Sequence, residues 1–213
     1  MRLVHVNVGL SLFGFSLACM LRSRVGLGPW DVFHEGVAAR TPLSVGMVIV
    51  VTGLALLVFA AAAARVRPGV GSVLNMLTVG PWVDVFLAST LVPRPESWSG
   101  GAALFGAGLV LNGLATGLYL SAGLGAGPRD GFALGMARVL GTTVARARTL
   151  TELTVLAAGW LLGGTVGAGT LVFAVTIGPL MQAGLRVCAP LARAYERAAA
   201  SAGDADAAEA PRR

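Results

Sequence analysis

The chain has 213 residues, of which 55% are hydrophobic and only 12% are charged, with sixteen basic and ten acidic side chains. Soluble domains carry about 25% charged residues, so this composition excludes an ordinary soluble protein and predicts a surface that faces lipid over most of its area. All sixteen basic residues are arginines that lie between apolar runs, a pattern typical of the positive-inside bias of membrane proteins rather than of nucleic-acid binding.

Six apolar runs are each long enough to cross a hydrocarbon core of roughly 30 Å, so the sequence predicts an all-α polytopic membrane protein with six transmembrane helices. In chain order the runs cover residues 3–21, 43–64, 69–92, 101–122, 143–162 and 167–188. Two shorter elements, 29–39 and 128–140, follow the first and the fourth run. At 1.5 Å per residue they reach about half way across a bilayer, which favours re-entrant half-helices over two further crossings.

The distribution of arginines predicts the orientation of the chain. With six spans, twelve arginines fall on the side of the N-terminus and four on the other side, namely Arg22, Arg24, Arg40 and Arg94. The positive-inside rule then places both termini in the cytoplasm. The C-terminal stretch "AAASAGDADAAEAPRR" is small, polar and aperiodic, so we expect a disordered cytoplasmic tail over 191–213.

The sequence contains an internal repeat. "GLGPWDVFHEGVA" at 26–38 and "GAGPRDGFALGMA" at 125–137 agree at seven of thirteen positions, 99 residues apart. "GSVLNMLTVGP" at 71–81 matches "GTLVFAVTIGP" at 169–179, 98 residues apart. Two matches in the same order predict a duplication, with one repeat over 1–97 and another over 98–190. Because each half has an odd number of spans, we expect two inverted three-helix repeats, each with a short half-helix.

The opening motif of each repeat has the composition of a helix start. Glycines allow a tight or left-handed backbone, proline suits the first helical position, and aspartate in the first turn can accept from free backbone N–H groups. Two interpretations stay open: a well-capped half-helix, or a carboxylate at membrane depth that binds an ion or solute. The motif residues are Gly28, Pro29 and Asp31 in the first repeat and Gly127, Pro128 and Asp130 in the second.

A glycine-proline pair also lies inside the third span of each repeat. A proline there kinks or unwinds the helix and can expose carbonyls to a cation or polar solute, although a simple packing kink is the alternative. Asp84 follows the pair Gly80-Pro81 by one turn, and Gln182 follows Gly178-Pro179 at the equivalent place. The candidate substrate- or ion-binding residues are therefore Asp31, Asp130, Asp84, Gln182, Asn75 and His34.

Several further polar residues have more ordinary interpretations. Arg148 and Glu152 are four residues apart on one helix face, which predicts an ion pair near the membrane surface or, if buried, a gate. Asn75 and Asn112 can hydrogen-bond between helices. His34 lies near two carboxylates, but a single histidine without cysteine does not predict a metal site. No catalytic or cofactor-binding motif occurs, so we expect neither an enzyme nor a cofactor.

Three stretches carry a family resemblance: "GLGPWDVFHEGVAARTPLSVG", "RPGVGSVLNMLTVGPWVD" and "LLGGTVGAGTLVFAVTIGP". Over residues 1 to 190 the chain resembles the YczE/YyaS/YitT-type family of bacterial integral membrane proteins and is most similar to its YczE branch. The resemblance implies a multi-pass protein of the bacterial inner membrane. It implies no mechanism.

Two functions follow as hypotheses. The first is a small secondary transporter or exporter with a polar site at the repeat interface, coupled to protons or sodium. The second is a non-transporting scaffold or accessory protein for another membrane-associated system, favoured by small size and by abundant small-xxx-small spacing. The first predicts contact with lipid and a small solute. The second predicts a homodimer or a membrane-protein partner.

Overall fold

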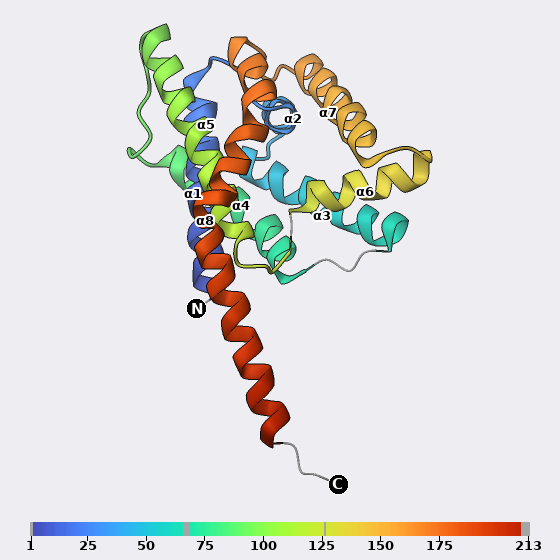
Figure 1. Cartoon of the computed structure of the whole chain (residues 1–213). Helices are drawn as coiled ribbons and strands as arrows, with labels where there is room; N and C mark the ends of the chain where they lie inside the picture. Colours follow the sequence, from blue (N-terminus) through green and yellow to red (C-terminus); the bar gives the residue numbers. More distant parts are fainter. Residues whose placement is uncertain (1, 66–68, 126, 210–213) are drawn as a thin grey trace.

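A computed structural model describes residues 2–65, 69–125 and 127–209 of the chain. Within these ranges the protein is all-helical, as the sequence predicts (Figure 1). The helices in chain order are α1 (Arg2–Ser23), α2 (Pro29–Arg40), α3 (Val45–Ala64), α4 (Val70–Ala88), α5 (Trp98–Leu120), α6 (Pro128–Leu140), α7 (Val144–Leu161) and α8 (Ala168–Glu209).

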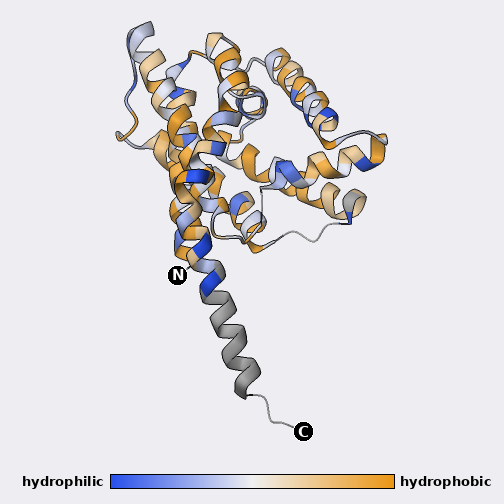
Figure 2. Cartoon of the chain, in the orientation of Figure 1, coloured by the Kyte–Doolittle hydropathy of each residue, from blue (hydrophilic) through white to orange (hydrophobic). Residues whose placement is uncertain are grey.

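Five helices are long and apolar enough to cross a membrane: α1, α3, α4, α5 and the first part of α8. Their ribbons are mostly hydrophobic along their length (Figure 2). The prediction of six spans is thus confirmed for five of them. The exception, α7, has 18 residues and includes Arg146, Arg148 and Glu152, which lower its hydropathy. The predicted span 143–162 coincides with this helix, but only the half after Glu152 is free of charged residues.

The last helix is longer than predicted. It runs for 42 residues to Glu209 and extends well beyond the other helices (Figure 1). We expected disorder from residue 191 onward, but the helix continues through most of that segment. Alanine is the best helix former, and the polar composition that suggested disorder is also alanine-rich. Residues 210–213 lie outside the described ranges, and the cytoplasmic position of this segment stays a prediction.

The two short helices begin in the same way. Gly28 and Gly127 precede them with nearly identical backbone angles, φ −66° and ψ 154° against φ −64° and ψ 166°, and a proline opens each first turn. Two residues earlier, Gly26 and Gly125 have φ of +140° and +119°. Only glycine adopts such angles without strain, so the expectation of an unusual backbone before each half-helix is confirmed.

The glycine-proline pairs inside the long helices behave differently from the prediction. α4 continues through Gly80 and Pro81, and α8 continues through Gly178 and Pro179. The expected broken backbone is therefore absent at these two places. A proline removes only one intrahelical hydrogen bond, and a long helix can retain its path around that loss.

The helices of the two halves pack on one another reciprocally. α1 packs on α5, at the centre of the bundle. α1 also packs on α4, and α5 packs on α8, while α3 of the first half lies on α6 of the second and α7 lies on α2. One pair breaks the pattern. α3 and α4 pack together, whereas among the described residues α7 and α8 make no comparable contact, and Figure 1 shows them apart.

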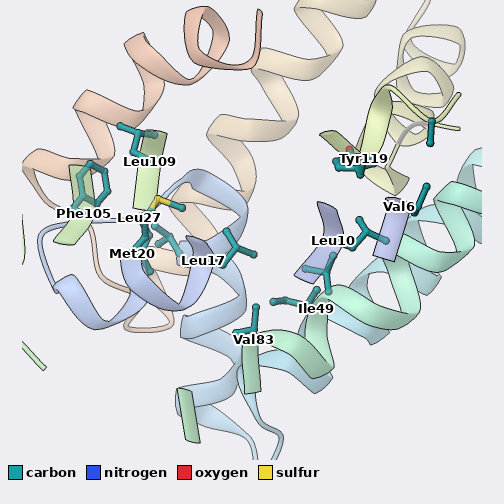
Figure 3. Close-up of a cluster of buried hydrophobic side chains, with 13 residues drawn as sticks. Val6, Leu10, Leu17, Met20, Leu27, Ile49, Val83, Phe105, Leu109 and Tyr119 are labelled. Atoms are coloured by element: carbon teal, nitrogen blue, oxygen red, sulfur yellow. The ribbon is translucent and has the colours of Figure 1, made fainter. Parts of the chain in front are cut away.

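The buried core follows α1 and α5 (Figure 3). Because lipid is as apolar as these side chains, close packing rather than the hydrophobic effect must hold the helices together. Glycine provides that closeness: a Cβ on Gly117 of α5 would overlap the backbone of Gly184 on α8, and one on Gly113 would meet Leu180 at 2.8 Å. The core side chains labelled in Figure 3 are Val6, Leu10, Leu17, Met20, Leu27, Ile49, Val83, Phe105, Leu109 and Tyr119.

Candidate functional site

A cavity of about 180 Å³ lies between the two halves. Both glycine-proline motifs line it, so the chain brings its two most similar segments to one place. Every helix contributes to the wall: Phe13 from α1 and Phe173 from α8, for example, lie on its apolar parts. The polar side chains of the lining are His34, Thr52, Asn75, Asn112, Thr116, Tyr119, Arg129, Asp130, Arg148 and Glu152.

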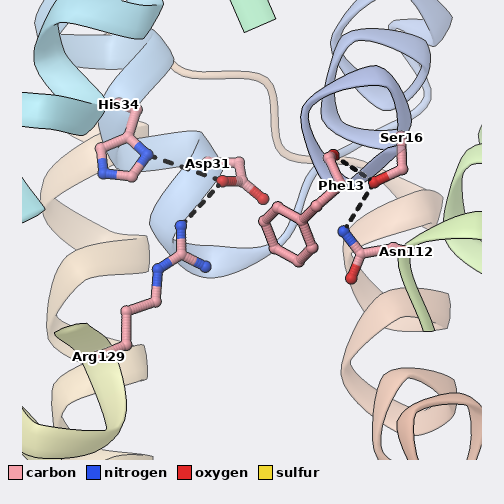
Figure 4. Close-up of polar contacts among 6 residues, drawn as sticks. All are labelled: Phe13, Ser16, Asp31, His34, Asn112 and Arg129. Carbon is pink, nitrogen blue, oxygen red and sulfur yellow. Dashed lines mark hydrogen bonds and ion pairs between the residues drawn. The ribbon is translucent and has the colours of Figure 1, made fainter. Parts of the chain in front are cut away.

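An ion pair joins the two half-helices beside this cavity (Figure 4). Nη2 of Arg129 on α6 donates to Oδ1 of Asp31 on α2 at 3.2 Å. Asp31 is buried, with 4% of its surface exposed, and the guanidinium of Arg129 also lies 5.5 Å from the ring centroid of Trp30. An isolated buried carboxylate is costly, so this arginine compensates the charge that the fold places at the start of α2.

The two motif aspartates do not have equivalent partners. Asp130 of α6 accepts from Nη1 of Arg148 at 3.2 Å, and Nε of the same arginine donates to Glu152 at 3.0 Å. The side chains of these three residues are 37–50% exposed, whereas that of Asp31 is 5% exposed. Both aspartates stand in the first turn of their helices, as the sequence predicts, but among the described residues neither accepts from a backbone N–H. Both carboxylates instead bind arginines of the second half.

His34 is the most unusual polar group of the lining. It is 2% exposed, and neither ring nitrogen has a hydrogen-bond partner in the described part of the chain. Its Nδ1 lies 3.7 Å from Oδ1 of Asp31, which is beyond hydrogen-bond distance (Figure 4). The neighbouring Glu35 turns away and accepts from the backbone N–H of Thr165 at 2.6 Å. No group of three or more described His, Cys, Asp or Glu residues could hold a metal ion.

The two asparagines of the long helices also reach the cavity. Asn75 is half-buried in its wall. Asn112 of α5 is buried and donates from Nδ2 to the hydroxyl of Ser16 on α1 at 3.0 Å (Figure 4). The predicted hydrogen bond between helices is therefore present for Asn112, and the same residue contributes to the lining.

Asp84 and Gln182 lie away from the cavity wall. Oδ1 of Asp84 accepts from the backbone N–H of Gly46 at 2.9 Å, and Oδ2 accepts from the hydroxyl of Ser44. This carboxylate thus ties α4 to the N-terminus of α3. Gln182 is exposed on α8. Of the six candidate binding residues, the structure places three in the cavity wall and a fourth beside it, and leaves Asp84 and Gln182 elsewhere. The four are His34, Asn75, Asp130 and, beside the wall, Asp31.

The sequence interpretation missed Arg129. Arg129 stands next to Asp130 in the second motif, and the equivalent position of the first motif is Trp30. Because the two residues differ, a search for identical residues in the two repeats does not find Arg129. The available signal was physical: an arginine in a short helix between apolar spans calls for a carboxylate partner, and Asp31 stands near the start of the other short helix.

Comparison with known proteins gives consistent matches along the chain. The family model described as "Family of unknown function (DUF6198)" matches residues 1–185. The uncharacterised membrane protein YczE of Bacillus subtilis is 33% identical over 175 residues, which cover 82% of this chain and 80% of that protein. An uncharacterised protein of Haemophilus influenzae is 30% identical over 182 residues, covering 85% and 82%. YyaS of Bacillus subtilis is 26% identical over 185 residues, covering 85% and 91%.

No solved structure gives a significant match. The resemblance to YczE and YyaS drawn from the repeat motifs is confirmed by the two Bacillus relatives, which align along most of their own length. Five apolar helices of sufficient length agree with the description of YczE as a membrane protein. The chain therefore belongs to the DUF6198 family and is a multi-pass membrane protein homologous to YczE of Bacillus subtilis.

Proposed function

We propose that this protein is a small secondary transporter or exporter built from two inverted repeats, and that its solute binds in the cavity between them. The observation that carries the proposal is a difference between two helix pairs that the repeat makes equivalent. α3 and α4 are packed together, while in the described part of the chain α7 and α8 make no comparable contact. Alternating access needs two such barriers, one closed when the other is open.

The contact between α3 and α4 is tight at one end. A Cβ on Gly46 would overlap both the carbonyl oxygen of Gly80 and the carboxylate of Asp84. That carboxylate accepts from the backbone N–H of Gly46 and from the hydroxyl of Ser44, the residue that caps α3. Small residues and a shared hydrogen-bond acceptor therefore hold the two helices in backbone contact.

The equivalent residues of the second repeat make no such contact. Counting 99 residues from Ser44 gives Thr143, which caps α7 as Ser44 caps α3. Counting 98 residues from Gly80 and Asp84 gives Gly178 and Gln182. No atom lies within 4 Å of the place where a Cβ on Gly178 would stand, and both Thr143 and Gln182 are exposed.

This asymmetry supports a transport cycle with one closed and one open barrier. In the alternate state, α8 would dock on the N-terminus of α7 through Gln182, while Asp84 would release α3. α7 would then be the sixth crossing. Its charged residues Arg148 and Glu152 line the cavity and form an ion pair with each other, so they do not need to face lipid. The half-exposed carboxylates Asp130 and Glu152 are the groups best placed to exchange a proton or sodium ion.

Paired cysteine cross-linking tests the proposal in native membranes, with Cys19 and Cys188 replaced by alanine. The pair Ser44→Cys/Asp84→Cys reports the contact between α3 and α4, and the pair Thr143→Cys/Gln182→Cys reports the contact expected in the alternate state. We expect both pairs to cross-link with a short reagent. In a chain that carries all four cysteines, formation of one cross-link should exclude the other.

A matched control uses Thr143→Cys with Val187→Cys, which lies on another face of α8 and should not cross-link. If the pair at 44 and 84 reacts and the pair at 143 and 182 never does, the second barrier does not close and the proposal fails. That result would favour the scaffold hypothesis, in which the α3–α4 contact is a fixed packing feature.

A further inference from the structure

The charged groups around the cavity leave an excess of negative charge. Three carboxylates, of Asp31, Asp130 and Glu152, stand against the two guanidinium groups of Arg129 and Arg148. Each arginine is already engaged, one with Asp31 and the other with both remaining carboxylates. Among the described lining residues no arginine is left to pair with an anionic ligand, whereas a cation would balance the surplus carboxylate.

His34 adds an unsatisfied hydrogen-bonding group at the same end. Its ring is buried, and its Nδ1 faces the Asp31 carboxylate at 3.7 Å. The carboxylate favours the tautomer that carries its proton on Nδ1. Burial disfavours the charged form of the ring, and Arg129 already balances the charge of Asp31, so the imidazole stays neutral. The lone pair of Nε2 then has no donor in the described chain. A buried acceptor without a donor is costly, so a ligand N–H is the group that this position lacks.

The remaining wall suits an apolar body beside a positive charge. Four aromatic rings line the cavity, from Phe13, Trp30, Tyr119 and Phe173. Aromatic faces attract ammonium groups, and the guanidinium of Arg129 already lies near one of them, at 5.5 Å from the Trp30 centroid. A dry apolar cavity of about 150 Å³ accommodates benzene in another protein, so about 180 Å³ suits one ring with a short substituent.

We propose that this cavity binds a small primary or secondary ammonium ion with an apolar body of about one ring. The ammonium donates an N–H to Nε2 of His34, its charge is balanced by the carboxylates of Asp130 and Glu152, and its ring lies against the aromatic wall. The inference rests on the proposed function only in taking the same cavity as the solute site.

Binding to purified protein in lipid nanodiscs tests the ligand class by titration calorimetry. Benzylammonium is the probe. Benzyl alcohol keeps the ring without the charge, benzyltrimethylammonium keeps the charge without an N–H donor, and benzoate reverses the charge. We expect benzylammonium to bind at least about tenfold more tightly than each of the other three. Equal or tighter binding of benzoate or benzyl alcohol, or no binding of benzylammonium, would overturn the proposal.

Variants assign the roles. His34→Phe should weaken benzylammonium binding about tenfold and abolish its advantage over benzyltrimethylammonium, while His34→Gln, which keeps a side-chain acceptor, should restore part of it. Glu152→Gln should reduce the preference for benzylammonium over benzyl alcohol. Val187→Ala lies outside the cavity, on an exposed face of α8, and should bind like the parent protein. If His34→Phe keeps the full preference for an N–H donor, the assigned role of this histidine is wrong.

The two proposals fail in distinguishable ways. Mutually exclusive cross-links without amine binding would support the transporter proposal and refute the ammonium ligand. Selective amine binding to a protein whose second barrier never closes would support the ammonium site and refute the transporter proposal.

Discussion

The buried ion pair between the half-helices makes a quantitative prediction. Replacing Arg129 with alanine leaves the carboxylate of Asp31 at 4% exposure without its arginine, with only the His34 ring 3.7 Å away. Removing one partner of a buried pair costs roughly 3–5 kcal/mol. The Arg129 side chain is 34% exposed, so solvent screens part of the interaction and we expect about 2–3 kcal/mol instead. For a chain of this length that corresponds to a decrease of roughly 5–10 °C in the unfolding midpoint.

Thermal unfolding of purified protein, followed by tryptophan fluorescence, measures this decrease. The double variant Asp31→Asn/Arg129→Ala removes both charges and should recover much of the loss, giving a coupling of about 1–3 kcal/mol in a double-mutant cycle with the two single variants. The exposed pair of Asp130 and Arg148 is the matched control, and we expect about 0–1 kcal/mol there. Additive effects at Asp31 and Arg129 would refute the reasoning, because they would mean that the two charges do not interact.

Three further predictions concern packing and hydrogen bonding, all checked by the same unfolding assay. Gly46→Ala should destabilise the protein by about 1–3 kcal/mol, since its Cβ would overlap the backbone of α4. Gly178→Ala should be neutral or stabilising by up to about 1 kcal/mol, because no atom stands near the added Cβ. Equal effects of the two substitutions would contradict the unequal packing of the two helix pairs. Arg22→Ala removes donors to three carbonyl groups at and beyond the end of α4 and should cost about 1–3 kcal/mol, so an unchanged midpoint would exclude a role in holding that end. Asn112→Leu loses the hydrogen bond to Ser16 and should cost about 0.5–1.5 kcal/mol, a prediction that a more stable variant would disprove.

The helices themselves could be predicted because their signals are local. Apolar runs and glycine-proline starts define α1 to α6 within a few residues of the observed bounds. α8 continues to Glu209 across the segment where the sequence predicts disorder, because alanine is common in both disordered and helical segments and only its helix propensity separates the two. The bounds predicted for the span 143–162 match α7, but the charges of Arg146, Arg148 and Glu152 in its first half make the helix less apolar than the five candidate spans.

The site could be predicted only where the repeat pointed to it. Both glycine-proline motifs, His34 and Asn75 line the cavity, and their sequence positions gave the reason to expect them there. The partner of Asp31 could not be found in the same way, since Arg129 is a residue in which the repeats differ. Asp84 holds α3 to α4 rather than facing the cavity, because the helix does not unwind at Pro81 and its carboxylate meets the start of α3 instead.

The most direct test of the account is the accessibility of the cavity from each side of the membrane. Asn75→Cys and Asn112→Cys place a thiol in the wall contributed by each half, in a background without Cys19 and Cys188. A membrane-impermeant thiol reagent is applied to each face of oriented vesicles, and the cross-link between positions 44 and 84 fixes one state. Transport through the cavity predicts labelling from both faces before cross-linking and from one face afterwards. Labelling from one face only in both conditions, or from neither face in folded protein, would contradict a transport path between the two halves.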